Sequence, residues 1–181
     1  MIEPGNPALV PDSTSLLNEF GIDREWLAER QLILYPEAAN LVVAQIDPDG
    51  RKHLLTPETA AAWEGLVQAA EADGIALHIT SAFRSVARQA EICRHKQAVG
   101  QSAEEIFTQS APPGFSEHHT GCAIDVGTPG CPPCTPEFET TSAFAWLSAR
   151  AGSFGFHLSF PRNNPQGFVF EPWHWRFALT P

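Results

Sequence analysis

The sequence predicts an α+β fold in which a small, largely antiparallel sheet is flanked by helices. Helical patterns and short strands are mixed along the chain without regular βαβ alternation, which argues against a parallel sheet. The 181 residues, of which 43% are hydrophobic, are enough for one domain with its own buried core. The chain contains no internal repeat and no low-complexity tract, so a repeat architecture is excluded.

The first half is expected to contribute two helices and two strands. Residues 1–15 are rich in proline and predict an N-terminal arm, which leaves 16–181 as a single domain. Asp23 is placed to cap a short helix, and Thr56 followed by Pro57 is typical of a helix start. The expected elements are, in order, a helix within 16–30, a strand at 41–46 ending at the turn 47–50, a helix from 56 to a stop at Gly74, and a strand within 75–83.

The second half mixes helices and strands in the same way. Gly100 and Gly152 mark the expected ends of two helices, because glycine readily adopts the conformation that closes a helix. A Pro/Gly/Cys-rich insertion at 127–136 interrupts the pattern. The expected elements are a helix at 85–98, a loop at 110–116, a strand at 122–126, a helix at 142–151 and strands within 156–160 and 167–177.

The charge balance excludes several classes of partner. Eleven Lys and Arg against 21 Asp and Glu give a net charge of −10, which is unsuited to nucleic-acid phosphates or to an anionic membrane surface. No apolar run approaches the roughly 20 residues of a membrane span. Residues 1–17 lack the pattern of a signal peptide. We therefore expect a cytoplasmic monomer, or a periplasmic or secreted protein if a leader was removed.

Four cysteines are too few for a disulfide scaffold. Cys131 and Cys134 form a CxxC pair, but the chain has no second CxxC and no thioredoxin-like context around this one. The pair is compatible with a local clasp, either disulfide or reduced, and equally with an inert pair. A structural zinc site is a third alternative that would need Cys122 or a histidine as further ligands.

Three short segments hold most of the polar groups that a packed core would not explain. They are Ser116-Glu-His-His-Thr-Gly-Cys-Ala-Ile-Asp125, Glu171-Pro-Trp-His-Trp175, and Ser81-Ala-Phe-Arg84 with Gln89 five residues further on. Any one of their histidines or acids alone would more often belong to a satisfied polar cluster without metal. Their joint occurrence favours a functional site.

The first segment places a histidine and an aspartate where they can converge. His118 and Asp125 are seven residues apart, so on one uninterrupted strand they would face opposite sides. Gly121 between them permits a turn, which leaves His118 on a loop and Asp125 on the strand behind it. An aspartate in so apolar a strand is costly to bury unless it is paired or binds a metal.

The second segment supplies another histidine and a second acid. Pro172 favours a turn that brings Glu171 and His174 toward one point. Two imidazoles and one carboxylate form a zinc set of the catalytic type, which leaves a fourth position for water. A glutamate close to the metal but not bound to it is the usual base that deprotonates this water.

Together, SxHxxGxAxD followed by ExWHW resembles the signature of the zinc D-Ala-D-Ala peptidases. These form the VanX/VanY group of the wider lysostaphin, D-Ala-D-Ala-peptidase and hedgehog-type superfamily. The resemblance covers roughly residues 40–177, with all three motifs in the family's order. It implies a small antiparallel sheet with flanking helices and a zinc ion in a cleft on the sheet. The insertion that contains Cys131 and Cys134 is not part of the family pattern.

The resemblance assigns roles residue by residue. It places the zinc ligands at His118, Asp125 and His174, the general base at Glu171, and a substrate-orienting, charge-stabilising arginine at Arg84. It also implies that Gln89 helps to hold the terminal carboxylate of the substrate, in a pocket formed with Arg84 and Ser116. Ser81 and Trp173 are further candidates for substrate contacts. His119 stays outside the ligand set because adjacent residues rarely reach one metal, although it is a candidate for a hydrogen bond to substrate.

The implied function is a zinc-dependent D-alanyl-D-alanine carboxypeptidase that trims the terminal D-Ala of peptidoglycan stem peptides or of D-Ala-D-Ala-terminated precursors. The same framework serves dipeptidases, L,D-carboxypeptidases and cell-wall endopeptidases, and the residues do not rank these activities. A zinc-bearing module that binds wall peptide without cutting it is the alternative from another class. The presence of Glu171 with the metal set argues against such a module.

Overall fold

The predicted α+β fold is confirmed by the computed structural model of the protein, which describes residues 11–178. The helices are α1 (Pro11–Glu19), α2 (Arg24–Glu29), α3 (Pro57–Ala72), α4 (Val86–Ala98), α5 (Ala103–Gln109) and α6 (Ser142–Arg150), with 3-10 turns η1 (Glu117–Thr120), η2 (Pro136–Thr140) and η3 (Ala151–Phe154). The strands are β1 (Val42–Ile46), β2 (Lys52–Leu55), β3 (His78–Ser81), β4 (Ala123–Gly127), β5 (Phe156–Leu158) and β6 (His174–Phe177).

The strands form two antiparallel sheets. β1 and β2 make a hairpin, and the central sheet has the order β3-β4-β6-β5. Every pair in the central sheet is antiparallel. Its middle strands, β4 and β6, carry Asp125 and His174, so the motif residues lie at the centre of the sheet rather than at an edge.

Three helix starts follow from the capping residues in the sequence. Asp23 accepts a hydrogen bond from the backbone N–H of Trp26 at 2.8 Å. Thr56 caps α3 in the same way, and Ser85 caps α4. Each cap satisfies a backbone donor that the first turn of a helix leaves unpaired.

Some elements differ from the expectation. Helix α1 begins at Pro11, inside the segment 1–15 expected to be an arm, and residues 1–10 of that segment lie outside the described residues. Strand β2 and helix α5 were not predicted. Helix α5 begins with a capping box, in which Ser102 and Glu105 each bond the backbone N–H of the other. No helix in residues 11–178 is long and apolar enough to cross a membrane.

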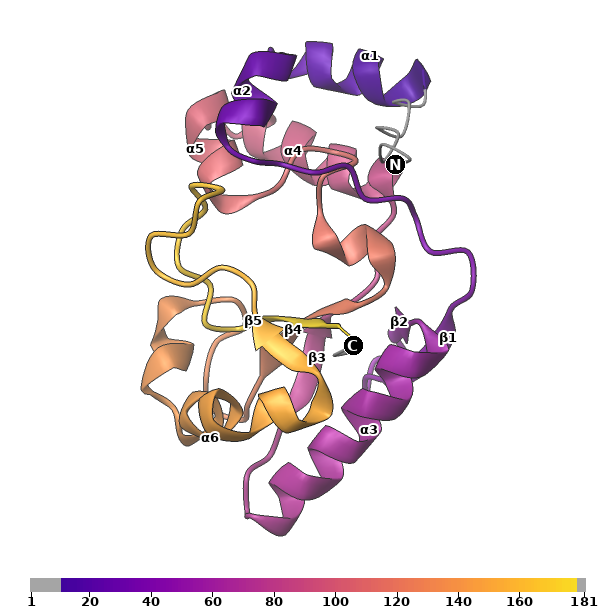
Figure 1. Cartoon of the computed structure of the whole chain (residues 1–181), viewed down its shortest axis with the longest axis vertical. Coiled ribbons are helices and arrows are strands. Elements are labelled where there is room, and N and C mark those ends of the chain that lie inside the picture. Colours follow the sequence, from indigo (N-terminus) through magenta and orange to yellow (C-terminus); the bar gives the residue numbers. More distant parts are fainter. Residues whose placement is uncertain (1–10, 179–181) are drawn as a thin grey trace, which may run out of the picture.

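Two hydrophobic clusters lie on opposite sides of the motif residues. The larger cluster packs the central sheet against α3 and α6 through side chains such as Trp63, Leu147 and Phe156. The smaller one joins α1, α2, α4 and α5 through side chains such as Phe20 and Phe107. Figure 1 shows these four helices together at the top and the sheet below them with α3 and α6.

Candidate metal centre and active-site cleft

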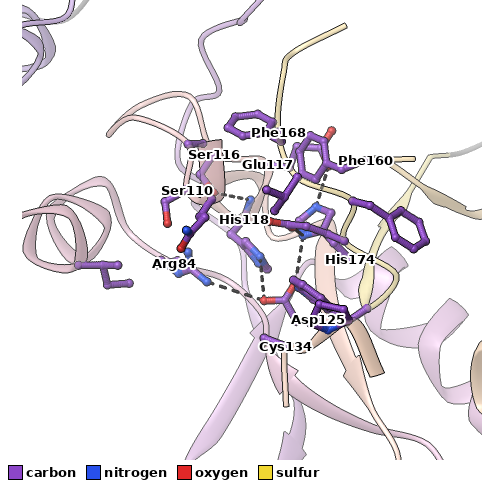
Figure 2. A pocket seen from close by; sticks show the side chains of 18 of the residues that line it. Arg84, Ser110, Ser116, Glu117, His118, Asp125, Cys134, Phe160, Phe168 and His174 are labelled. Carbon is purple, nitrogen blue, oxygen red and sulfur yellow. Dashed lines mark hydrogen bonds and ion pairs between the residues drawn. The ribbon is translucent and has the colours of Figure 1, made fainter. Parts of the chain in front are cut away.

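A cleft of about 500 Å³ opens between the two clusters. Helix α4, turn η1, strand β4 and the segment that connects β5 to β6 all contribute to its walls. Figure 2 shows the polar side chains converging on one point of this cleft. Its lining includes Arg84, Lys96, Ser110, Ser116, Glu117, His118, Asp125, Cys134, Phe160, Phe168, Glu171, Trp173 and His174.

Three side chains at the bottom of the cleft form a potential metal-binding group. His118, Asp125 and His174 are all buried, and one donor atom from each lies within 4.8 Å of the others. Asp125 and His174 are direct cross-strand partners in the β4–β6 register. His118 reaches them from η1, which ends at Gly121 in the left-handed conformation. The turn inferred at Gly121 therefore brings the two ends of the first motif together.

The orientation of the His118 ring leaves one nitrogen available for a metal. Its Nδ1 lies 2.8 Å from the backbone carbonyl oxygen of Ala82, an acceptor that fixes the ring hydrogen at Nδ1. Its Nε2 lies 3.3 Å from Oδ2 of Asp125. Burial lowers the pKa of His118, which favours the neutral ring that a metal requires.

His174 is held between two carboxylates. Its Nδ1 lies 3.0 Å from Oδ1 of Asp125, and its Nε2 lies 3.0 Å from Oε2 of Glu117. Burial disfavours the charged ring, but the hydrogen bonds to Asp125 and Glu117 outweigh burial and raise the pKa of His174 to about 10. Burial alone would also raise the pKa of Asp125, yet the two histidines hold that pKa well below its usual range.

Glu171 lies beside this group without joining it. The backbone N–H of His174 donates to the Glu171 carbonyl at 3.1 Å, which closes the turn predicted at Pro172. An oxygen of the Glu171 carboxylate then lies 3.8 Å from Nδ1 of His174. Burial raises the pKa of Glu171 to about 7, a value suited to an acid–base group at neutral pH.

Arg84 faces the metal-binding group from the opposite wall. Its Nη2 lies 3.9 Å from Oδ2 of Asp125 and donates to Oγ of Ser81 at 2.9 Å. Its Nη1 donates to Oε1 of Gln89 at 2.8 Å, and Nε2 of Gln89 donates to the Ala111 carbonyl at 2.6 Å. Gln89 is completely buried and does not line the cleft, so both ends of its amide position Arg84 and the neighbouring loop. This corrects the expectation that Gln89 contacts the carboxylate of the substrate.

The remaining motif residues divide between cleft and core. Ser116 lines the cleft and caps η1. Trp173 also lines the cleft and packs against the larger hydrophobic cluster. His119 is fully buried: its Nδ1 lies 2.6 Å from the Arg84 carbonyl oxygen, and its Nε2 accepts from the Gly114 N–H. Both its nitrogens are thus engaged by the backbone, which corrects the expectation of a hydrogen bond to substrate.

Glu117 stands next to His118, and the motifs predict no role for it. The structure buries its carboxylate between His174 and Arg176, with Oε1 3.2 Å from Nη1 of Arg176. Burial opposes the charged form, but the hydrogen bond to His174 and the charges of His174 and Arg176 together outweigh it and lower the pKa of Glu117 to about 2. Only its position inside the SxH motif signals this role in the sequence, because its partners are distant along the chain.

Cys131 and Cys134 are free thiols in the structure. Cys134 lines the cleft, where its Sγ lies 3.7 Å from Oγ1 of Thr80. Its backbone φ is +54°, a conformation that few residues other than glycine adopt. The insertion therefore forms part of the cleft wall next to Asp125, as Figure 2 shows.

With this geometry established, comparison with known proteins identifies the family. The family model VanY, described as D-alanyl-D-alanine carboxypeptidase, matches residues 52–180. The chain belongs to the VanY family. The resemblance inferred from the motifs is thereby confirmed. All of the motif residues discussed above lie within the matched range.

Individual VanY-like proteins support the same placement. A D-alanyl-D-alanine carboxypeptidase of Enterococcus faecalis is 32% identical over 125 residues, which cover 64% of this chain and 45% of that protein. The chain spans less than half the length of this and another curated relative.

Solved structures agree with the fold and include one with zinc. The LD-carboxypeptidase LdcB matches with a TM-score of 0.69 and 27% identity, over 78% of this chain and 69% of that one. A mutant of the D,D-pentapeptidase VanY from a VanB-type resistance cassette, solved in complex with Zn(II), matches with a TM-score of 0.61 and 26% identity, over 84% and 88% of the two chains.

Proposed function

We propose that this chain is a zinc-dependent D-alanyl-D-alanine carboxypeptidase that removes the terminal D-Ala of peptidoglycan stem peptides or their precursors. The observation that carries the proposal is the convergence of two imidazoles and a carboxylate beside a partly buried glutamate in the cleft of a VanY-family chain. A VanY relative solved with Zn(II) supports the choice of metal.

The donor set fits zinc. Tetrahedral zinc with bonds of 2.0–2.1 Å separates its ligand atoms by about 3.3 Å. The distances from Asp125 oxygens to Nε2 of His118 and Nδ1 of His174 are 3.3 and 3.0 Å. The other nitrogen of each ring faces a hydrogen-bond acceptor, Ala82 O or Glu117 Oε2. Such outer partners orient histidine ligands and make them more basic.

The proposed reaction uses a metal ion, a general base and an arginine. His118, Asp125 and His174 would hold the zinc ion, which when bound would supply a Lewis acid for the scissile carbonyl and for water. Glu171 takes the proton of the attacking water and then returns it to the leaving amine. Its raised pKa, about 7, suits it to both transfers. Arg84, which lines the same cleft, stabilises the negative charge that develops on the carbonyl oxygen.

The activity is tested by identifying the products released from defined peptides. The purified chain is incubated with a stem pentapeptide ending in D-Ala-D-Ala, with the corresponding tetrapeptide and with free D-Ala-D-Ala, each with zinc or with a chelator. The proposal predicts that mass spectrometry finds tetrapeptide plus D-Ala from the pentapeptide only when zinc is present. Zinc-dependent binding without any cleavage would instead indicate a wall-peptide-binding module.

An L,D-carboxypeptidase is a second candidate, because the LdcB LD-carboxypeptidase is among the structures that match. In that case the same experiment would release D-Ala from the tetrapeptide and leave the pentapeptide intact. Cleavage of free D-Ala-D-Ala alone would indicate a dipeptidase. Cleavage of the pentapeptide, of the tetrapeptide or of free D-Ala-D-Ala alone therefore identifies the chain as a D,D-carboxypeptidase, an L,D-carboxypeptidase or a dipeptidase, respectively.

A further inference from the structure

One wall of the cleft carries a positive charge that the proposed chemistry does not use. Lys96, one of only two lysines in the chain, lies in the last turn of α4 and lines the cleft. It is partly buried, and its Nζ donates to Oγ of Ser110 at 2.8 Å. Ser110 follows α5 and lines the same cleft, and Figure 2 shows it on the same side as Arg84.

Lys96 has no acidic partner among the side chains that the structure describes. The other cleft cation, Arg84, lies within ion-pair distance of Asp125, whereas the partner of Lys96 is a neutral hydroxyl. Burial lowers the pKa of Lys96, which shows that removing the ammonium from water is unfavourable. A partly buried cation without a carboxylate, in a chain of net charge −10, is best explained by an anionic ligand.

Lys96 and Arg84 belong to one wall of the cleft. Arg84 donates to Gln89, and Gln89 donates to the carbonyl of Ala111. The residue before Ala111 is Ser110, which accepts the hydrogen bond from Lys96. Because α4 carries both Gln89 and Lys96, the two cations are held by the same helix and the same loop.

The position of this wall relative to Glu171 indicates which part of a substrate it faces. Lys96 and Glu171 both line this cleft. In a carboxypeptidase, the base returns its proton to the leaving amine, and one Cα separates that nitrogen from the terminal carboxylate. The carboxylate carbon is therefore about 2.5 Å from the nitrogen. A terminal carboxylate therefore lies close to Glu171, in the cleft that Lys96 and Ser110 also line.

We propose that Lys96 and Ser110 bind the free C-terminal carboxylate of the substrate and restrict the chain to removing the terminal residue. An endopeptidase substrate would present a neutral amide at the same place and leave the ammonium unpaired. The inference rests on the proposed function and deepens it. Lys96 acts here as a specificity-determining residue, while Gln89 serves to position Arg84.

The test compares a peptide ending in D-Ala-D-Ala with its C-terminal amide. Replacing Lys96→Met keeps the length of the side chain and removes its charge. Lys52→Met is the matched control, because Lys52 is the only other lysine and is exposed on β2. We expect Lys96→Met to reduce kcat/KM for the acid roughly tenfold to a hundredfold, mainly through KM, and to change the amide less than about twofold. The control should keep the wild-type preference for the acid.

Binding measurements separate this inference from the proposed function. Calorimetry on the zinc-loaded Glu171→Gln variant compares the affinities of the acid and the amide without turnover, and Lys96→Met is then added to that background. The inference predicts that the preference for the acid is lost. It also predicts that Ser110→Ala loses less of the preference for the acid. The Ser110→Ala variant provides the test if Lys96→Met does not fold.

Each outcome bears on one of the two proposals. Equal affinity of the acid and the amide for the Glu171→Gln variant would overturn the carboxylate subsite even if the wild type cleaves the acid. An unchanged preference in both the Lys96 and Ser110 variants would also overturn it. Acid-selective binding that depends on Lys96, with no cleavage by the wild type, would support the subsite and refute the proposed carboxypeptidase activity.

Discussion

Nε2 of His174 lies 3.0 Å from a carboxylate oxygen of Glu117, while Nδ1 of the same ring lies 3.0 Å from Asp125. Glu117 also contacts Arg176, two residues beyond His174 on β6, at 3.2 Å. The carboxylate therefore fixes one ring nitrogen and leaves the other directed at Asp125. This arrangement turns a buried histidine into an oriented donor for a metal.

The contact between Glu117 and His174 predicts a loss of metal affinity when the charge is removed. Glu117→Gln should weaken zinc binding by about 10- to 100-fold, the usual effect of removing the outer partner of a histidine ligand. Competition with a chromophoric chelator measures the affinity. Glu64→Gln, on the exposed face of α3, is the control. Equal zinc affinities of the two variants would show that Glu117 does not act through His174.

Zinc affinity should rise with pH. Without metal, His174 retains its proton up to pH about 10, so zinc must displace a proton at neutral pH. One displaced proton corresponds to an increase in affinity of about tenfold per pH unit. The same competition assay at pH 6, 7 and 8, corrected for protonation of the chelator, measures the slope. An affinity independent of pH would contradict the description of His174 as protonated in the metal-free site.

Metal binding and turnover should be separable by mutation. Glu171→Ala and Glu171→Gln should keep zinc bound and reduce turnover by at least about 10²- to 10⁴-fold, the usual contribution of a general base. His174→Ala should lose both zinc and activity. His95→Ala on the exposed surface of α4 should lose neither. Metal content by mass spectrometry and release of D-Ala are the two readouts, and normal turnover in either Glu171 variant would exclude its role as base.

Gly121 should be intolerant of a side chain for reasons of packing as well as backbone conformation. Its φ is +65°, and an added Cβ would lie 2.7 Å from Cδ2 of Leu41 and 3.3 Å from the backbone N of Thr56. Gly130 has a φ of +82° with no atom within 4 Å of that position. Both alanine variants share the backbone penalty, so their difference isolates the packing.

We expect Gly121→Ala to lower the free energy of unfolding by about 1–3 kcal/mol more than Gly130→Ala does. Urea denaturation of the two variants, with the wild type as reference, gives this difference. Equal losses of unfolding free energy in the two variants would mean that Leu41 and Thr56 shift to accommodate the added methyl group without a cost in stability. Because the N–H of Gly121 donates to the carbonyl of His118, the same variant should also weaken zinc binding.

Local signals were sufficient for much of the fold. Asp23, Thr56 and Ser85 cap helices where the sequence predicts them, because capping depends on residues three positions apart. The same reasoning applies to α5, whose capping box is visible in the sequence as Ser102 and Glu105. Strand β2 is harder to predict, because a strand of four residues is defined by its partner β1 rather than by its own pattern.

In the candidate site, too, some contacts are predictable from short motifs and others depend on residues distant in the sequence. His118 approaches Asp125, and Glu171 approaches His174, as their motifs predict, because each motif spans a single turn and the strand beside it. The two motifs meet through the pairing of β4 with β6. The burial of Gln89 and the partner of Glu117 depend on residues far away along the chain. The unpaired charge of Lys96 is equally invisible in the sequence, since it depends on which acids its helix faces.

A crystal structure of the Glu171→Gln variant with zinc and a peptide ending in D-Ala-D-Ala, measured at the zinc absorption edge, would locate the metal relative to its proposed ligands. The account predicts one anomalous peak bound by Nε2 of His118, Nδ1 of His174 and a carboxylate oxygen of Asp125, with the scissile carbonyl beside it. An anomalous peak held by other residues, or none between these three, would contradict it.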